Sequence, residues 1–237
     1  KALAQAQSVV ERRNTIPILA NVLIEAEGNQ VSFRATDLDI EVVDRAPAMV
    51  ERAGATTVSA VMLHEIVRKL PDGALVNLTE DAASGRLTIM AGRSTFSLAT
   101  LPRDDFPVIA ETDLPSGFSL PAATLRQIID KTRFAISTEE TRYYLNGIFL
   151  HVAPGTPATL RAVATDGHRL AKIELPCPEG AEGMPDVIVP RKCIGEIRKL
   201  LDEVDGDVEL SLSGSKIRFK LGNAVLTSKL IDGTFPD

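Results

Sequence analysis

The chain has 237 residues, is 44% hydrophobic and 24% charged, and carries a formal net charge of −6. This length allows one or two domains, and the composition is that of an ordinary globular protein. No apolar run approaches the roughly 18 residues that a membrane-spanning helix needs, and the first residues lack the order of a signal peptide. Cys177 and Cys193 are too far apart for a redox pair and lack companion ligands for zinc. The sequence therefore predicts a cytoplasmic protein with reduced thiols, no metal and no membrane contact.

The first half of the chain predicts a helix, strands, a second helix and further strands. Asn14 and Pro17 end the first helix, and Ser59 is a suitable N-cap for the second. The trio Glu27-Gly28-Asn29 is typical of a turn between two strands. The expected helices cover residues 1–12 and 61–70, and the expected strands cover residues 18–25, 30–36, 39–45, 75–80, 86–91 and 95–100.

The second half repeats this order. Ala35-Thr36-Asp37 returns as Ala164-Thr165-Asp166, and Phe106-Pro107 returns as Phe235-Pro236. The offset is 129 residues for both pairs, and other elements return at a similar offset. A steady offset across separate elements indicates a tandem duplication of one α+β unit.

The repeat also suggests where the units begin and end. We expect a first domain over residues 1–116 and a second over residues 117–237. The second unit opens with a strand at Phe118 before its first helix, whereas the chain begins inside the first helix of the first unit. By this comparison about ten residues precede Lys1 in a complete first unit.

The positive charge of the chain is concentrated on its predicted helices. Residues 1–13, 60–70, 122–137 and 191–201 hold 12 lysines and arginines against 4 acidic residues. The remainder holds 14 basic and 28 acidic residues. If the helices share one face, that face is positive and suits the phosphate backbone of DNA without reading bases.

The segment from Asp166 to Leu170 admits two interpretations. Asp166 and His168 could form a catalytic acid–base pair, but the sequence has no nucleophile elbow, no phosphate-binding glycine loop and no further ligands for a metal. The first unit keeps the Thr-Asp corner as Thr36-Asp37 without the histidine or arginine. We therefore expect Thr-Asp to be a structural corner, with the aspartate capping a turn, and Gly167–Leu170 to form a contact surface.

Several blocks of the chain resemble the bacterial DNA polymerase III beta subunit, the replicative sliding clamp. They are RYYLNG, ATDGHRLA, VIVPRK and TSKLIDGTFPD in the second unit, and TIPILANVLIEA, ATDLDIEV and RSTFSLATLPRDDFP in the first. The resemblance covers essentially the whole chain. It implies tandem DNA-clamp domains, each with two helices packed on antiparallel sheets, arranged as an arc of a ring. Family subunits have three such domains, so a third lies outside this chain.

The resemblance implies a non-catalytic processivity factor without cofactors. Two subunits form a ring around duplex DNA, and the helices line the hole. One departure from the family is Glu139, where the family can carry a glutamine, and with Glu140 beside it two carboxylates would weaken phosphate attraction in this loop. The residues expected to contact DNA are Arg13, Arg126, Lys131, Arg133, Tyr143, Tyr144, Arg191, Lys192, Arg198 and Lys199.

The resemblance also implies partners. The polymerase III catalytic subunit, the clamp loader, and repair and translesion polymerases insert a hydrophobic peptide between the second and third domains. This chain supplies part of that pocket, for which we expect reduced affinity, and the subunit interface of a homodimer is expected at Phe96, Leu98 and Ile66. The residues expected in the pocket are Leu145, Thr165, Gly167, His168, Arg169, Leu170 and Pro236.

Two alternatives remain open at the level of the sequence. One is a hydrolase or transferase that uses Asp166 and His168 in a cleft. The other is an acidic two-domain adaptor that does not meet DNA.

Overall fold

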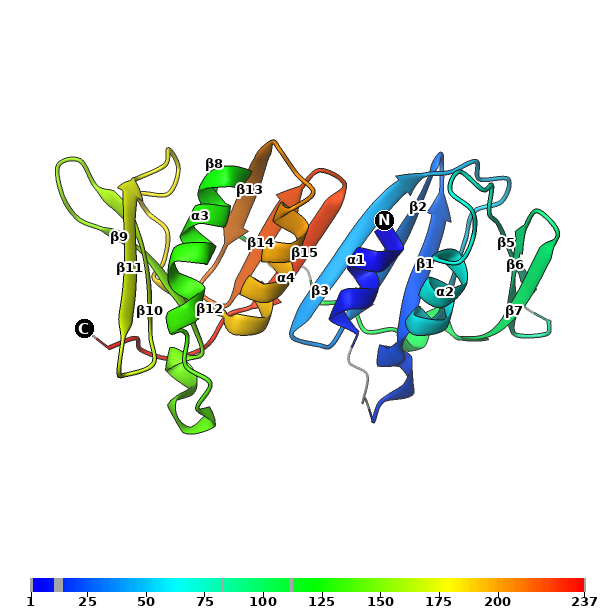
Figure 1. Ribbon diagram of the computed structural model, residues 1–237, viewed down its shortest axis with the longest axis horizontal. Helices are drawn as coiled ribbons and strands as arrows, with labels where there is room; N and C mark the ends of the chain where they lie inside the picture. Colours follow the sequence, from blue (N-terminus) through cyan, green and yellow to red (C-terminus); the bar gives the residue numbers. More distant parts are fainter. Residues whose placement is uncertain (1, 11–14, 82, 111–112, 237) are drawn as a thin grey trace. The chain divides into compact units, whose positions relative to one another are not determined.

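The computed structural model describes residues 2–10, 15–81, 83–110 and 113–236, which divide into two compact units, Lys1–Ile109 and Ala110–Asp237. Figure 1 shows the helices and strands of each unit. The first unit contains α1 (Ala2–Val9), β1 (Asn21–Glu27), β2 (Gln30–Thr36), β3 (Ile40–Pro47), β4 (Gly54–Ser59), α2 (Ala60–Val67), β5 (Asn77–Asp81), β6 (Arg86–Ala91) and β7 (Ser94–Leu101). Short 3-10 helices cover Pro17–Ala20 and Arg103–Asp105.

The second unit follows the same order with one additional strand in front. It contains β8 (Ser116–Pro121), α3 (Ala122–Thr132), β9 (Gly147–Ala153), β10 (Thr159–Thr165), β11 (Leu170–Pro176), β12 (Val187–Pro190), α4 (Arg191–Leu201), β13 (Asp207–Leu212), β14 (Lys216–Leu221) and β15 (Ala224–Lys229). Short 3-10 helices cover Arg133–Ala135 and Glu140–Leu145. Helix, four strands, helix and three strands recur in both units, as the internal repeat predicts.

All the strand pairs within each unit are antiparallel. In the first unit the strand order is β5-β6-β7-β4-β1-β2-β3, where β7 meets β4 only at Thr100 and Leu101. In the second unit the orders are β11-β10-β9-β12 and β15-β14-β13-β8. The α+β fold class expected from the sequence is therefore confirmed.

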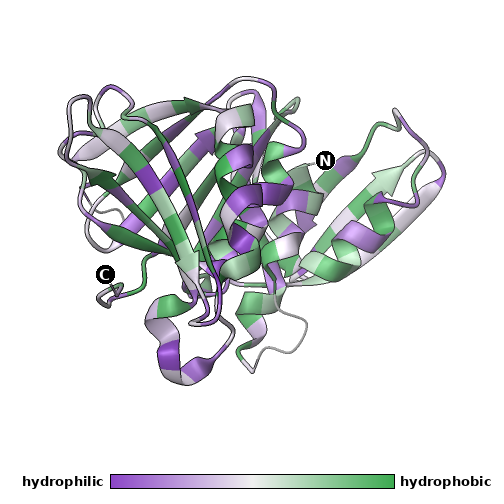
Figure 2. Ribbon diagram, turned by 60° about the vertical axis from the view of Figure 1, so that its left-hand side comes forward, coloured by the Kyte–Doolittle hydropathy of each residue, from purple (hydrophilic) through white to green (hydrophobic). Residues whose placement is uncertain are grey.

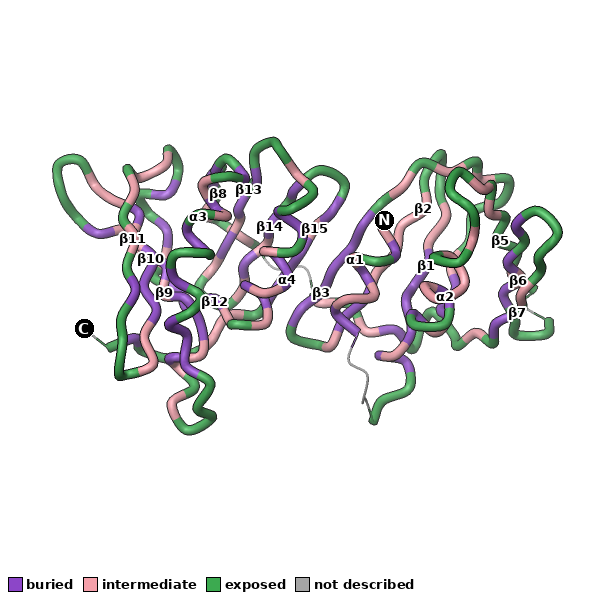
Figure 3. The backbone as a smooth tube through the Cα atoms, viewed as in Figure 1, coloured by how far each residue is buried: buried purple, intermediate pink, exposed green. Residues whose placement is uncertain are grey.

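The hydrophobic core of each unit lies between its helices and its sheets. In the first unit Ala6 of α1 and Leu63 of α2 are buried together with Val22, Val58 and Ile89 of the strands. In the second unit α3 and α4 bury apolar side chains such as Ile129 and Ile197, and buried and exposed positions alternate along both helices, as Figure 3 shows. Figure 2 shows the corresponding alternation of hydrophobic and hydrophilic residues along the helices.

The element boundaries differ from the sequence predictions in several places, among them α1, which ends at Val9, and α3, which ends at Thr132. Strand β4 was not predicted, and the chain enters β1 through a 3-10 turn rather than extending from residue 18. Helix α2 ends at Val67, so Arg68 and Lys69 follow the helix instead of lying in it. Ser59 caps α2 as expected, because its Oγ accepts a hydrogen bond from the Met62 amide at 3.4 Å.

The Thr-Asp corner of the first unit is a tight turn between β2 and β3. Thr36 Oγ1 donates to the carbonyl of Ile40 at 2.9 Å, and Asp37 Oδ1 accepts from the amides of Asp39 and Ile40. Leu38 takes the positive-φ position of this turn, with φ at 83°.

The second unit builds the same turn between β10 and β11. Thr165 Oγ1 donates to the carbonyl of Arg169 at 2.7 Å, and Asp166 Oδ1 accepts from the amides of His168 and Arg169. Gly167 takes the positive-φ position, with φ at 88°. The predicted structural corner is therefore confirmed in both units, with equivalent hydrogen bonds.

Candidate functional site

Helices α3 and α4 carry six lysines and arginines of the second unit against two acidic residues. Each begins directly after a proline that ends a strand, Pro121 for α3 and Pro190 for α4, so the two helices start at fixed points on the sheets. Apolar side chains face the sheets, and the polar sides carry lysine and arginine. Local sequence thus places a row of cations on the outer side of both helices.

Arg198 joins the two helices. Its Nε donates to Asp130 Oδ1 of α3 at 2.9 Å, and its Nη1 donates to Asp202 at the end of α4. These hydrogen bonds, first with Asp130 and then with Asp202, raise the pKa of Arg198 above its usual value. Only 18% of the side chain is exposed, so Arg198 is a structural link between α3 and α4.

Arg126 makes a second link between these helices. Its Nη2 donates to the carbonyl of Leu201, and its Nε lies 3.9 Å from Asp202 Oδ1. The guanidinium therefore holds the C-terminal end of α4. Two of the residues expected to contact DNA thus have a packing role that the sequence did not indicate.

The other cations of these helices are more accessible. Arg133 pairs with Asp130 at 3.4 Å and Lys199 pairs with Glu196 at 2.8 Å, but both keep more than half of their side chains exposed. Lys131 and Arg191 are exposed, and within the described ranges no ion pair involves either of them. The acidic side chains lower the positive charge of this surface without cancelling it.

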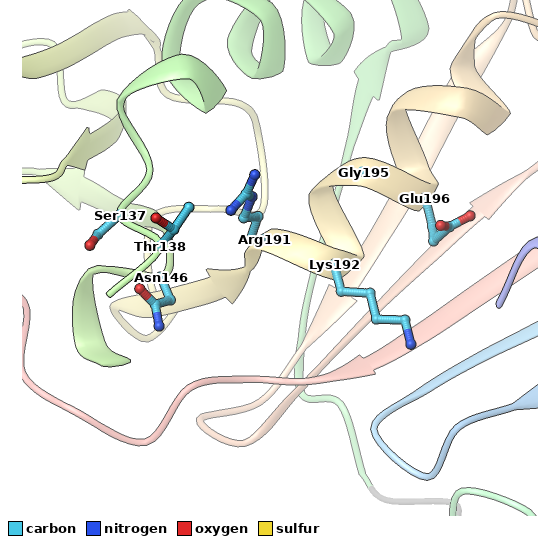
Figure 4. Close-up of a pocket in the computed structure, with 7 residues that line it drawn as sticks. All are labelled: Ser137, Thr138, Asn146, Arg191, Lys192, Gly195 and Glu196. Atoms are coloured by element: carbon cyan, nitrogen blue, oxygen red, sulfur yellow. The ribbon is translucent and has the colours of Figure 1, made fainter. Parts of the chain in front are cut away.

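A shallow open cavity of about 490 Å³ lies at the start of α4. Figure 4 shows Ser137, Thr138 and Asn146 on one side of it and the first turn of α4 on the other. Arg191 and Lys192 supply cations to its rim, while Glu196 supplies a carboxylate. The cavity borders the loop that carries the two tyrosines.

The predicted basic residues of the first unit are less prominent. Arg13 lies outside the described residues. Arg68 and Lys69 both approach Glu65, at 2.7 and 4.0 Å. Among the described residues, the helices of the first unit therefore present less unpaired positive charge than α3 and α4.

The two tyrosines differ in exposure. Tyr143 exposes 53% of its surface, whereas Tyr144 is half-buried and packs on the apolar cluster below. Their rings meet edge to face with centroids 5.8 Å apart. Tyr143 is thus the member of the pair that can touch another molecule.

The turn from Asp166 to Leu170 is not arranged as an acid–base pair. The Asp166 carboxylate accepts hydrogen bonds from the amides of His168 and Arg169 and from the Arg169 guanidinium, each at 3.0 Å. The two amide hydrogen bonds, together with that of Arg169, lower the pKa of Asp166 to about 2. The carboxylate therefore maintains the turn and stays ionised at neutral pH.

Beneath this turn lies a small apolar cluster. It consists of Leu145, Val163, Ile188 and Phe235, with Tyr144, Phe149 and Ile231 packed against them. Phe149 stacks on Phe235 with the ring centroids 4.9 Å apart, and His151 stacks on Phe149 at 4.5 Å. Burial lowers the pKa of His151, so the stacked imidazole favours its neutral form.

The residues expected in the peptide pocket differ in burial. Leu145 is buried and exposes only 3% of its surface, whereas Leu170 exposes 64% at the first position of β11. Thr165 is half-buried in the corner. The exposed remainder consists of Gly167, His168, Arg169 and Pro236.

Two further residues join this surface, Phe134, which sequence reasoning missed, and Arg142, whose contact there was not predicted. Phe134 exposes 54% of its surface, and the Arg169 guanidinium lies 5.7 Å from its ring centroid. Arg142 lies against Gly167, where an added Cβ would come within 2.5 Å of Arg142 Nη1. Phe134 falls outside the helical spacing of Leu125, Ile128 and Ile129, so the sequence could have indicated that its ring is exposed. No sequence pattern indicates the contact between Arg142 and Gly167.

The residues expected at the subunit interface face inward in the first unit. Leu98 is buried in the core, and Phe96 and Ile66 pack against that core. Strand β7 nevertheless pairs with β4 only at its last two residues, so much of one of its edges lacks a strand partner among the described residues. The unpaired part of this strand is its backbone edge, along the residues before Thr100.

Side chains that could ligate a metal do not cluster in the described part of the chain. No group of three or more His, Cys, Asp or Glu side chains there could hold a metal ion. Both cysteines are free, and burial raises the pKa of the Cys193 thiol to about 12. No helix among the described residues is long and apolar enough to cross a membrane.

Comparison with protein families gives two adjoining matches. Residues 1–110 match the N-terminal domain of the DNA polymerase III beta subunit, and residues 119–237 match its central domain. The chain belongs to the DNA polymerase III beta subunit family. The family resemblance read from the sequence is confirmed, and members of the family are non-catalytic.

Related proteins extend beyond this chain. It is 57% identical to a beta sliding clamp of Caulobacter vibrioides over 238 residues, and 44% identical to that of Pseudomonas aeruginosa over 240 residues. Both matches cover 100% of the chain and 64% of the relative. The chain therefore spans slightly less than two thirds of the length of these relatives.

Solved structures give the same result for the fold. The Caulobacter crescentus pol III beta structure matches with a TM-score of 0.96 and 56% identity, over 100% of this chain and 64% of that one. A DnaN sliding clamp from Bartonella birtlesii bound to griselimycin matches with a TM-score of 0.96 and 52% identity, over 100% and 63%. Both similarities cover the two units described above.

Proposed function

We propose that the protein carrying this chain is a bacterial sliding clamp, which encircles duplex DNA and tethers the replicative polymerase for processive synthesis. The observation that carries the proposal is the cationic surface of α3 and α4, where Lys131, Arg133, Arg191 and Lys199 are exposed. A cationic surface without base-reading groups binds duplex DNA through phosphates, independently of sequence. Weak contacts of this kind permit sliding.

The proposed DNA contacts follow from exposure. Lys131, Arg133, Arg191, Lys192 and Lys199 are accessible, together with Tyr143. Arg126 and Arg198 remain proposed contacts, but their links between α3 and α4 suggest that they position the helices. Arg13 is retained on the strength of the family resemblance alone.

We propose that partner proteins dock a hydrophobic peptide at the turn after β10. Leu145 offers a buried apolar floor, and Leu170 offers an exposed apolar rim beside His168 and Arg169. Such a surface suits a peptide with apolar anchor side chains and polar flanks. The polymerase III catalytic subunit, the clamp loader, and repair and translesion polymerases are the proposed partners.

The first unit carries a different side chain at the position that corresponds to Leu170. At the position of Leu170 the first unit has Glu41, which is buried, pairs with Arg34 at 2.9 Å and accepts from the Ile109 amide at 3.3 Å. The segment at Ile109 therefore lies against Glu41, next to the turn of the first unit. Leu170 places an apolar side chain at this position and exposes 64% of its surface.

The remaining parts of the proposal concern assembly. We propose that residues 1–116 and 117–237 are two clamp domains, that a third domain completes the subunit, and that two subunits form the ring in the cytoplasm. The open edge of β7, with Phe96, Leu98 and Ile66 behind it, is the proposed interface with the second subunit.

The test is topological. The complete protein carrying this chain is loaded onto nicked circular DNA by its clamp loader, and the amount retained is measured before and after the circle is cut once. A ring is retained on the circle and lost from the linear ends, since no base contact holds it. Equal retention on both forms would contradict the proposal and favour a grip on the DNA itself.

A further inference from the structure

Arg142 and Glu139 form a closed pair beside the tyrosines. Arg142 Nε and Nη2 donate to the two carboxylate oxygens of Glu139, at 2.8 and 2.7 Å. This is the bidentate fork that guanidinium groups make with carboxylates and with phosphates alike. The pKa of Glu139 is lowered, first by this hydrogen bond, so the carboxylate stays charged at neutral pH.

The backbone around Arg142 holds the side chain in this place. Arg142 interrupts the 3-10 segment Glu140–Leu145 with φ −108° and ψ 51°, and its guanidinium lies against Gly167. The next residue in the chain is the exposed Tyr143. Arg142 therefore lies between the tyrosines and the turn after β10, on a loop that borders the cavity at the start of α4.

We propose that Arg142 is an additional phosphate-contact residue for duplex DNA and that Glu139 masks it by occupying its fork. The inference rests on the proposed function. Glu139 supplies two oxygens in the geometry that a phosphodiester would supply, and the two anions compete for one guanidinium. The ion pair between Glu139 and Arg142 thereby weakens DNA contact at this loop and favours rapid sliding.

The pair is accessible enough for this competition. The side chain of Arg142 is 34% exposed and that of Glu139 is 52% exposed, so the ion pair contributes little to stability and exchanges readily. The other charged groups that act on Arg142 and Glu139 are Asp166 and His168. Asp166 is already bonded to Arg169 and to two amides, so it does not replace Glu139 at the fork.

The chain offers a matched control in the neighbouring carboxylate. Glu140 is exposed, and within the described part of the chain no ion pair involves it. Glu139→Gln and Glu140→Gln remove the same charge from the same loop, but only the first frees Arg142. Any general effect of charge on DNA affinity therefore appears equally in both variants.

The experiment measures the affinity of the complete protein for a fluorescent duplex at several salt concentrations. Glu139→Gln is expected to bind several-fold more tightly, and its plot of log affinity against log salt should be steeper by about 0.9, the value for one further phosphate. Glu140→Gln should keep the wild-type slope. Equal changes in the two variants would overturn the inference.

Arg142→Ala completes the design. Alone it leaves the Glu139 carboxylate unpaired, so it should weaken binding only by the general effect of one charge, about the size of the gain in Glu140→Gln. Combined with Glu139→Gln it should cancel the gain. Melting temperatures check that each variant is folded. A large loss in Arg142→Ala alone would mean that Arg142 already contacts DNA and would refute the masking. Absence of DNA binding by the wild type would instead refute the proposed function.

Discussion

Single residues of one chemical type take different roles around the turn after β10. Leu145 and Leu170 are both leucines of the proposed pocket, yet one is buried in an apolar cluster and the other is exposed at the start of an edge strand. Removing Leu145 would open a cavity in the fold, whereas removing Leu170 changes only the surface. Leu170 is therefore the residue that reports on docking alone.

Leu170→Ser should weaken binding of a hydrophobic partner peptide by about fivefold, because about 1 kcal/mol of apolar burial is lost on docking. Stability should change little, since 64% of the side chain is exposed. Titration calorimetry with the peptide measures the affinity. Leu75→Ser is the control, since Leu75 is 77% exposed in the first unit and lies outside the proposed pocket. Equal losses in both variants would contradict docking at Leu170.

At the scale of elements, two glycines show opposite constraints. Gly147 begins β9 where this strand meets β12, and an added Cβ would overlap the backbone carbonyl of Val189. Gly195 lies within α4, and nothing stands within 4 Å of its added Cβ. The close approach of β9 and β12 requires glycine at residue 147, whereas α4 only tolerates glycine at residue 195.

Gly147→Ala should destabilise the fold by about 1–3 kcal/mol through overpacking against a backbone that cannot move aside. Gly195→Ala should stabilise it by up to about 1 kcal/mol, because alanine loses less entropy in a helix. Urea unfolding of each variant measures both changes. The same sign for both substitutions would contradict this account of the β9–β12 contact.

At the scale of the whole molecule, charge and apolar surface are separated. The net charge is −6, yet the exposed side of α3 and α4 is cationic, and the surface at the turn after β10 combines apolar and polar groups. A polyanion and a hydrophobic peptide can therefore be bound by one acidic protein. The two kinds of contact should respond differently to salt.

Raising the salt concentration from about 50 to 200 mM should lower the affinity for duplex DNA by tenfold or more, through the loss of counterion release. The affinity for a hydrophobic peptide should change by less than about twofold, since apolar burial is not screened. Fluorescence anisotropy with each ligand, on the same protein preparation, measures both. Parallel losses would indicate that the peptide surface is also electrostatic.

The sequence was sufficient for features that depend on local pattern. The repeat of Thr36-Asp37 at Thr165-Asp166 predicted equivalent corners, and Ser59 predicted the start of α2. Strand β4 was missed because Gly54-Ala-Thr-Thr shows neither alternation nor a hydrophobic run. Helix α2 was predicted three residues too long because its apolar spacing continues to Leu70, beyond the last helical residue.

The sequence alone therefore determined the α+β repeat, the family resemblance and the concentration of basic residues on helices. Each of these depends on residues that are neighbours in the chain or that recur at a fixed spacing. Only the tertiary structure decided which cations are free. Arg198 and Asp130 are 68 residues apart yet bonded, and Arg142 is held by Glu139 while it lies against Gly167. The physical reason is that an ion pair depends on distances in space, which the folded backbone fixes and the order of residues does not.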